Sequence, residues 1–394
     1  MLKVAMAVSD DIDVEVAVAN VLSECSDQMD GKLPQVGILF TSCMDADFKA
    51  MLARITAHYP DMELIGCTTS GEVTSTQGFS EDSVALLLLS SDTVHFATSV
   101  ARDISKTPEI SIQKAFEECK AKLASDPVCA IVLPDGLTIG SIPLDRLLCS
   151  VMGESFPVFG GLAADQFNLV QTFQFCGGEA YSDAMPVLLF GGDLTISAGV
   201  FPGPVPFGPF HEIDSSESNI IHSIDGKTVK EFYIEEFGEL NAAYSNFPFA
   251  VYPEHDDNYF LRSPFQVDED TGSMAFLGTF PEKFRVRLSQ ALREDIRRSA
   301  EKANKKLLSD LREQAPELIL IFPCTSRRHV LGSETDKDFA LLRSSAKHVP
   351  FFGFYCYGEI GPFSVGLPTL FHNETVTSVA LSSKAHKIDD KKTF

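Results

Sequence analysis

The sequence predicts a mixed α/β protein of two domains, with stacked mixed β-sheets that are flanked by helices and built from repeated strand–helix–strand–strand units. Three observations lead to this prediction. The chain has 394 residues, which corresponds to two or three domains at roughly 150 residues each. Its hydrophobic fraction of 44% and charged fraction of 22% are typical of a globular protein and exclude disordered, collagen-like and coiled-coil chains. One arrangement of strands and helices also occurs three times along the chain.

Each repeat has an apolar strand, a polar loop, an amphipathic helix, a second strand with a glycine near its end, and a further strand. Strands as apolar as these on both faces are usually buried under helices. The alternative is a chance match, because strands followed by helices are common in α/β proteins. The first strands start at residues 36, 129 and 318 and the glycines are Gly66, Gly160 and Gly353, so the spacings are 30, 31 and 35 residues.

Helices are predicted within and between the repeats from the spacing of the apolar residues. The first repeat has a helix near residues 45–58, and in the second repeat Pro143 stands at a first-turn position of a helix. In the third repeat the helix begins after Ser333. Connecting helices are predicted over residues 109–124 and 289–313.

The turn IDGK (224–227) is the best candidate for a domain boundary. It divides the chain into an N-terminal domain of residues 1–228 and a C-terminal domain of residues 229–383, followed by a frayed tail of residues 384–394. The Pro- and Gly-rich stretch VFPGPVPFGP (200–209) is predicted to be neither a helix nor a central strand.

Charge and cysteine content restrict the partners and the compartment. The 32 basic and 55 acidic residues give a net charge of −23, which repels nucleic acid and anionic lipid, so we expect the protein to bind neither. The nine cysteines include no C-x-x-C pair, which fits free thiols in a reducing cytosol. The first apolar segment is too short for a signal peptide and no apolar run approaches the length of a membrane span. We therefore expect a cytoplasmic protein.

Small polar residues and glycines follow the strands in each repeat. In open α/β sheets such strand ends form the ligand crevice, and glycines let backbone N–H groups approach a ligand closely. The alternative is that these residues simply form turns. The candidate ligand-binding residues at the strand ends are Ser42, Thr68, Thr69, Asp135, Gly160, Gly161, Cys324, Tyr355 and Glu359.

Two arginines complete the candidate site. Arg327 comes shortly after the strand LILIF and offers a planar fork for a carboxylate or phosphate. In an extended loop Arg328 would point away from the strand end, so Arg327 is preferred. Arg262 lies among the apolar residues of YFLRSPF. For these arginines the alternative role is an ion pair in an acid-rich protein.

Other chemistry is weakly indicated, and no catalytic residue is assigned. Glu72 and Glu359 stand at matching places in the first and third repeats, where a capping role is favoured over an acid–base pair because nothing in the sequence brings them together. The nine histidines contain no H-x-x-x-H pair, so no metal site is expected, although one histidine in an apolar pocket would suffice for a non-covalent haem. Cys67 or Cys324 as a nucleophile requires a thiol of depressed pKa.

Several of these motifs resemble the FIST sensory proteins. The N-terminal half of that family is similar to ELIGCTTSGE, DSVALLLLS and FPVFGGLAAD. Its C-terminal domain is similar to LRSPFQVDEDTGSMAFLG, ILIFPCTSRRHVLG, VPFFGFYCYGEIGP and FHNETVTSVAL. The resemblance runs from about residue 30 to residue 382 in the expected order. It implies a cytoplasmic signal-input module that binds small ligands, with amino acids favoured. In other members the module is fused to an output domain, and some stand-alone members are associated with haem and nitric oxide sensing beside a histidine kinase.

The leading hypothesis is therefore a small-ligand sensor that acts on a separate output partner, such as the histidine kinase of a two-component system. A separate partner is expected because the resemblance uses nearly the whole chain and leaves no stretch for an output domain. We expect the ligand to be an amino acid or another carboxylate and the pocket to lie between the two domains, with the cofactor unassigned. The alternatives are a haem-based nitric oxide sensor and a cysteine-nucleophile enzyme.

Overall fold

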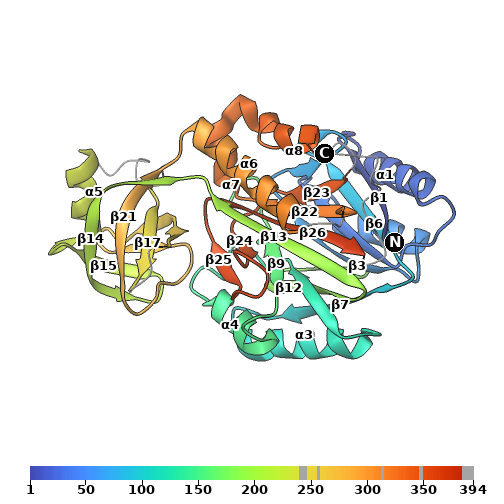
Figure 1. Ribbon diagram of the computed structural model, residues 1–394, viewed down its shortest axis with the longest axis horizontal. Coiled ribbons are helices and arrows are strands. Elements are labelled where there is room, and N and C mark those ends of the chain that lie inside the picture. Colours follow the sequence, from blue (N-terminus) through green and yellow to red (C-terminus); the bar gives the residue numbers. More distant parts are fainter. Residues whose placement is uncertain (239–245, 255–257, 312–314, 346–348, 384–394) are drawn as a thin grey trace.

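The computed structural model describes residues 1–238, 246–254, 258–311, 315–345 and 349–383. The predicted tail, residues 384–394, lies outside the described residues. Within the described residues, three six-stranded mixed sheets form the core, and a fourth sheet lies to one side of it (Figure 1). The predicted mixed α/β class is confirmed.

The first sheet has the strand order β1-β6-β2-β3. β2 and β3 are parallel, and β6 runs antiparallel to both β1 and β2. Two amphipathic helices, α1 and α2, cover its outer face with their apolar sides. The elements are β1 (Lys3–Ser9), α1 (Val14–Met29), β2 (Val36–Thr41), α2 (Phe48–His58), β3 (Glu63–Thr68) and β6 (Val84–Ser90).

The second sheet repeats this order as β7-β12-β8-β9, again with one parallel pair, β8 and β9. Helices α3 and α4 cover its outer face. The elements are β7 (Val94–Arg102), α3 (Pro108–Lys122), β8 (Pro127–Val132), α4 (Leu144–Met152), β9 (Val158–Gly161) and β12 (Ala184–Gly192).

The third sheet has the order β13-β26-β22-β23, with β22 and β23 parallel. Its outer face packs against α6 and α8. The elements are β13 (Leu194–Pro202), α6 (Arg293–Asp310), β22 (Leu318–Pro323), α7 (Thr325–Leu331), the 3-10 helix η2 (Gly332–Lys337), α8 (Ala340–Ser345), β23 (Phe351–Phe354) and β26 (Thr375–Ser383). The three sheets share one strand order and one set of directions, so the predicted repeat is a repeat of structure.

Each repeat also donates a hairpin to another sheet. The hairpin of the first repeat pairs with β23, that of the second with β3, and that of the third with β9. The three sheets are thereby interlinked in a closed cycle. The hairpin strands are β4 (Glu72–Thr74) and β5 (Gly78–Ser80), β10 (Gln174–Cys176) and β11 (Glu179–Tyr181), and β24 (Glu359–Gly361) and β25 (Leu370–His372).

The inner faces of the three sheets pack against one another in one hydrophobic core. Phe40 of the first sheet stacks on Phe352 of the third with ring centroids 5.1 Å apart, and Phe159 and Phe190 of the second sheet belong to the same cluster. Helices lie outside this core on all three sheets. In the part of the chain that the structure describes, none of them combines the length and apolar character needed to cross a bilayer.

The fourth sheet is an insert between β13 and α6, visible at the left of Figure 1. It has its own hydrophobic cluster beneath α5. β14 precedes residue 228 and pairs with β21, which follows it, so both this sheet and the third one use strands from either side of the predicted boundary. Its elements are β14 (Val205–Glu217), β15 (Ile220–Ile224), β16 (Lys227–Thr228), α5 (Val229–Phe237), β17 (Phe249–Pro253), β18 (Phe260–Arg262), β19 (Pro264–Val267), β20 (Met274–Phe276) and β21 (Phe284–Gln290).

Some local predictions need correction. The helix predicted over residues 289–313 begins only at Arg293, because Phe284–Gln290 forms a strand. The helix predicted after Ser333 is replaced by α7, η2 and α8, since Gly332 adopts a φ of 57° that ends α7. The Pro- and Gly-rich stretch does contribute to two strands, each paired on one side only along these residues. Residues 200–202 end β13 and pair with β26. Residues 205–207 begin β14 and pair with β21, because β15 joins β14 only from Ile213 onward.

Candidate functional site

The second strands of the three repeats meet at their carboxyl ends. Ala164 N donates to Thr68 O at 2.9 Å, and Ser70 N donates to Tyr355 O at 3.0 Å. Leu162 N donates to the carbonyl oxygen of Gly358 at 2.9 Å. These bonds join each repeat to the next, so the three strand ends that were predicted to form the ligand crevice lie together.

Glycine is required at these strand ends because the neighbouring parallel strand lies too close for a side chain. A Cβ on Gly160 would lie 1.9 Å from Val132 O, and one on Gly353 would lie 1.7 Å from Ile321 O. A Cβ on Gly161 would lie 2.8 Å from the Cys356 side chain. Gly160 and Gly161 therefore serve the packing of strands, which is a sufficient reason for their presence without a ligand.

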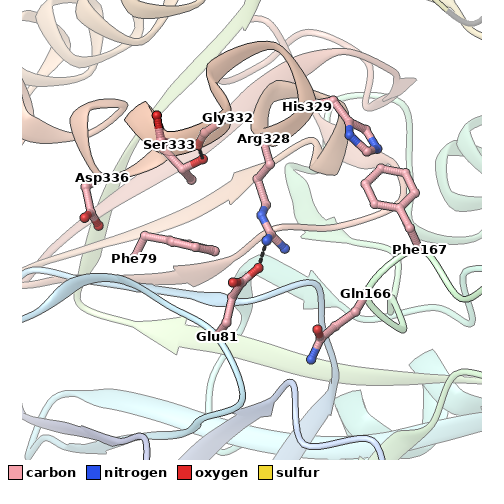
Figure 2. A pocket seen from close by; sticks show the side chains of 10 residues that line it. Phe79, Glu81, Gln166, Phe167, Arg328, His329, Gly332, Ser333 and Asp336 are labelled. Carbon is pink, nitrogen blue, oxygen red and sulfur yellow. Dashed lines mark hydrogen bonds and ion pairs between the residues drawn. The ribbon is translucent and has the colours of Figure 1, made fainter.

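A cavity of about 510 Å³ opens beside the meeting point of the repeats (Figure 2). All three repeats contribute to its lining. Phe79 and Glu81 come from the hairpin region of the first repeat, Gln166 and Phe167 from the second, and Arg328, His329, Gly332, Ser333, Thr335 and Asp336 from α7 and η2 of the third.

Arg328 is the central cation of this cavity. Its guanidinium lies over the Phe79 ring, 4.6 Å from the centroid, donates to the backbone oxygen of Ser70, and forms an ion pair with Glu81 through Nη2. Burial lowers the pKa of Arg328. Its Nε–H is buried and has no hydrogen-bond partner among the described residues, which leaves one donor of the guanidinium fork unsatisfied.

A tightly held loop of the second repeat forms the facing wall. Asp165 accepts backbone N–H groups from Leu169 at 3.0 Å and Val170 at 2.7 Å, and also accepts the Tyr357 hydroxyl. Gln166, Phe167 and Leu169 have φ values of 56°, 64° and 53°. This left-handed backbone conformation is unfavourable for residues other than glycine. The Asp165 carboxylate thus fixes a strained loop that presents Phe167 to the cavity.

Arg327, the preferred candidate from the sequence, is fully buried away from this cavity. Its Nε and Nη2 donate to Asp338 at 3.0 and 2.6 Å, and its Nη1 donates to Ser299 Oγ at 3.0 Å. The chain after β22 is helical from Thr325 rather than extended, and successive side chains on a helix are turned by about 100°. That rotation directs Arg328 into the cavity and Arg327 into the interior.

Arg262 is also buried, at the junction of the insert and the core. Its Nε donates to Thr279 O at 2.9 Å and its Nη1 donates to Phe371 O at 3.1 Å. Burial lowers its pKa to about 10. These bonds to backbone oxygens attach the insert to β25, and neither Arg262 nor the two residues that accept its bonds line the cavity.

The predicted polar residues of the first repeat surround Glu72. Ser42 Oγ donates to the Glu72 carboxyl group at 3.0 Å, and the hydroxyls of Thr69 and Ser83 donate to it as well. Burial raises the pKa of Glu72 to about 7, against the opposing effect of these hydrogen bonds. Thr68 uses its hydroxyl elsewhere, to accept the Phe173 N–H at 3.0 Å.

Glu359 occupies the corresponding place in the third repeat. It accepts the backbone N–H and the hydroxyl of Thr375 at 2.9 and 2.7 Å. Burial raises its pKa to about 8. Each glutamate is bound within its own repeat. Asp135 caps the backbone N–H groups of Leu137 and Thr138 at 2.9 and 3.1 Å, and the Tyr355 hydroxyl donates to Asp338 at 3.1 Å.

The buried thiols do not have the property that a nucleophile requires. Burial raises the pKa of both Cys67 and Cys324 well above the ordinary value, whereas a reactive thiolate needs a lowered pKa. The nearby carboxyl group of Glu359 adds to the rise at Cys324. The cysteine-enzyme alternative therefore finds no support at either residue.

The cavity also does not fit a haem. His329 lines it and packs on Phe167 with ring centroids 4.2 Å apart. The walls carry the charged groups of Glu81, Arg328 and Asp336, rather than the apolar surface that would enclose a haem ligated by one histidine. No cluster of three or more His, Cys, Asp or Glu residues in the described ranges could hold a metal ion. His255, His348 and His386 lie outside those ranges.

Three of the cavity residues, Glu81, Gln166 and Phe167, carry no pattern in the sequence that would mark them as binding residues. Glu81 and Gln166 adjoin predicted strand ends, but many polar residues do. Phe167 is an exposed aromatic residue, 39% accessible, which has no periodic partner in the sequence. For Arg328, the one sequence feature that pointed to a binding role was its position directly after Arg327, close to the end of a predicted strand.

Together the fold and the cavity define a class of protein, an α/β protein of three interlinked repeats with a polar and aromatic cavity where they meet. Comparison with known domains identifies its family. The FIST N domain matches residues 35–227 and the FIST C domain matches residues 229–362. The chain belongs to the FIST family, as the resemblance predicted. FIST domains are associated with signal-transduction sensing of small ligands.

Relatives are found in archaea and bacteria. An uncharacterized protein of Methanocaldococcus jannaschii is 23% identical over 77% of this chain, and the aligned part spans 62% of that protein. An uncharacterized protein of Mycobacterium tuberculosis is 23% identical over 92% of this chain and 95% of its own length. Among solved structures, cyanuric acid hydrolase from A. caulinodans aligns with a TM-score of 0.42 and 8% identity, covering 98% of this chain and 100% of the enzyme.

Proposed function

We propose that this protein is a sensor that binds an amino acid or another small carboxylate around Arg328 and acts on a separate signalling protein, such as a histidine kinase. One observation carries the proposal. Arg328 stands in a cavity lined by all three repeats, with a buried Nε–H that lacks an acceptor among the described residues. Membership of the FIST family supports the sensing role.

The lining favours a ligand with a carboxylate and an apolar part. A carboxylate that binds side-on to a guanidinium takes Nε and Nη2 together, and Nε is the donor that Arg328 has free. Phe79 and Phe167 provide apolar surface on two sides. The volume of about 510 Å³ falls within the ordinary range for small-molecule pockets.

The shared lining also supports a way to transmit a signal. A ligand that contacts groups from three repeats favours the arrangement of the repeats that binds it best, and it shifts the population only by its difference in affinity between arrangements. A partner that recognises one arrangement would respond. We place the protein in the cytoplasm, because its nine cysteines are free thiols, as is usual in a reducing compartment.

The test combines a ligand screen with Arg328→Gln. Amino acids and simple carboxylates are screened by thermal shift, and the best ligand is titrated calorimetrically against the wild type and the variant. Loss of a charge-assisted contact is worth ~1.5–3 kcal/mol, so affinity should fall about 10- to 150-fold. The control is Arg298→Gln on α6, which removes an exposed arginine paired with Glu294 and should leave affinity unchanged. Equal affinity of Arg328→Gln and wild type, or no stabilisation by any compound, would refute the proposal.

A further inference from the structure

Glu81 holds the position on Arg328 that a ligand carboxylate would take. Its carboxylate pairs with Nη2 of Arg328, and Figure 2 shows the pair in the middle of the cavity, between Phe79 and Gln166. The Glu81 side chain is 45% accessible, whereas that of Arg328 is only 19% accessible. Arg328 is therefore held by the backbone oxygen of Ser70 and by the Phe79 ring, and Glu81 is the partner that can move.

A simple carboxylate would enter this cavity against an electrostatic penalty. It would compete with Glu81 for one guanidinium and leave a second anion unpaired beside it. Other acids add to that penalty, since Asp336 lines the same cavity and Asp82 is bound to Gln166 at 2.9 Å. Like charges that share one small site are destabilising, above all where burial reduces screening.

A ligand that carries its own cation beside the carboxylate avoids this penalty. Its carboxylate takes Nη2 and the free Nε of Arg328, and its ammonium group takes the released Glu81. The four charges then alternate in sign around a closed cycle. Both charged groups of the protein remain paired, and each exchange replaces one charge-assisted contact by another.

We infer that Glu81 is the specificity-determining residue of this cavity and that it selects zwitterionic ligands over simple carboxylates. The inference rests on the proposed function, because it assumes that Arg328 receives the ligand carboxylate. In the absence of ligand, Glu81 also keeps the guanidinium paired, so the empty cavity is not a general anion trap.

The experiment uses two probes that differ only in the ammonium group, phenylalanine and 3-phenylpropanoate. Both are titrated calorimetrically against wild type, Glu81→Gln and Asp336→Asn at one pH and salt concentration. Glu81→Gln should weaken phenylalanine about tenfold or more through loss of a charge-assisted contact, and it should leave 3-phenylpropanoate unchanged or tighter. Asp336→Asn removes the same charge from another wall and should change the ratio of the two affinities much less.

The possible results distinguish the role of Glu81 in selectivity from the existence of a carboxylate site at Arg328. If both probes bind wild type and Glu81→Gln changes them equally, the role of Glu81 is refuted while the carboxylate site stands. An equal change of the ratio in Asp336→Asn also refutes it, because selectivity would then come from the general charge of the cavity. If neither probe binds wild type, the proposed site fails for these compounds and the inference falls with it. Thermal unfolding of each variant checks that the fold is intact.

Discussion

Glu72 shows how a single buried carboxyl group can couple the fold to pH. The group is fully buried and accepts hydrogen bonds from the hydroxyls of Ser42, Thr69 and Ser83. Burial raises its pKa from 4.5 to about 7. In this pH interval the folded chain keeps a proton that the unfolded chain releases. Linkage then requires the free energy of unfolding to fall as the pH rises through the interval.

We therefore expect Glu72→Gln to flatten the pH dependence of stability. Glutamine does not titrate, and its single amide oxygen can still accept the hydrogen bonds from Ser42 and Ser83, while its NH2 group donates to the Thr69 hydroxyl. Between pH 4.5 and about 7 the wild type should lose stability on the order of 3 kcal/mol from this residue, and the variant should lose less. Urea unfolding at pH 5, 6.5 and 8 measures the difference. A variant whose stability stays parallel to that of the wild type across these pH values would contradict the prediction. Glu359, with a pKa raised to about 8, gives a second contribution of the same sign that the variant retains.

At the scale of the element, the parallel strand pairs require a glycine, because a residue with a side chain would not fit between the two strands. β23 passes β22 so closely that a Cβ on Gly353 would lie 1.7 Å from Ile321 O. The corresponding Cβ on Gly66 would lie 2.0 Å from Leu39 O. The atom in the way is a backbone oxygen of a buried strand, which has no freedom to rotate aside. The strand itself would have to shift.

Gly353→Ala should for this reason destabilise the protein by at least ~3 kcal/mol, at the upper end of overpacking effects. Gly140→Ala is the matched control, because its Cβ would meet no atom within 4 Å, and a substitution at such a site usually changes stability by less than about 0.5 kcal/mol. Chemical unfolding of both variants gives the two values. Similar stabilities of Gly353→Ala and Gly140→Ala would show that the close approach is not a constraint.

The helices and strands also show which features could be predicted from the sequence. The exchanged hairpins and the choice of arginine could not be predicted, for physical reasons. Amphipathic periodicity is a local property, so the helices near residues 45–58 and 109–124 were found within a few residues of their true bounds. Long apolar strands likewise revealed the three repeats. The exchanged hairpins are short and pair with strands from other repeats, and no local pattern encodes such a partner. The choice between Arg327 and Arg328 depended on whether one turn was extended or helical, which the sequence did not determine.

At the scale of the whole molecule, the chain contains one interlinked core and one insert. The core includes the inner faces of all three sheets, and each sheet is completed by a hairpin from another repeat. The insert has a separate hydrophobic cluster. It enters and leaves the core at one place, since Val205 at the start of β14 is paired with Gln290 at the end of β21. The cavity-lining residues all belong to the core.

This arrangement predicts opposite results for two deletions. Replacement of residues 205–290 by a short Gly/Ser linker should leave a folded core, because the joined ends are already neighbours and a flexible connection of this kind is thermodynamically inexpensive. The loss of the Arg262 contacts to β25 should lower the melting temperature without abolishing cooperative unfolding, and ligand affinity should remain within about threefold, a difference below 1 kcal/mol.

Residues 1–193 alone should fail to fold, because hairpin β4–β5 then lacks β23 and the inner faces of two sheets lose the third. Circular dichroism melts and calorimetric titration provide the readouts. A cooperatively folded 1–193 fragment would show that the repeats are independent domains, and an unfolded core after removal of the insert would show that the insert is part of it.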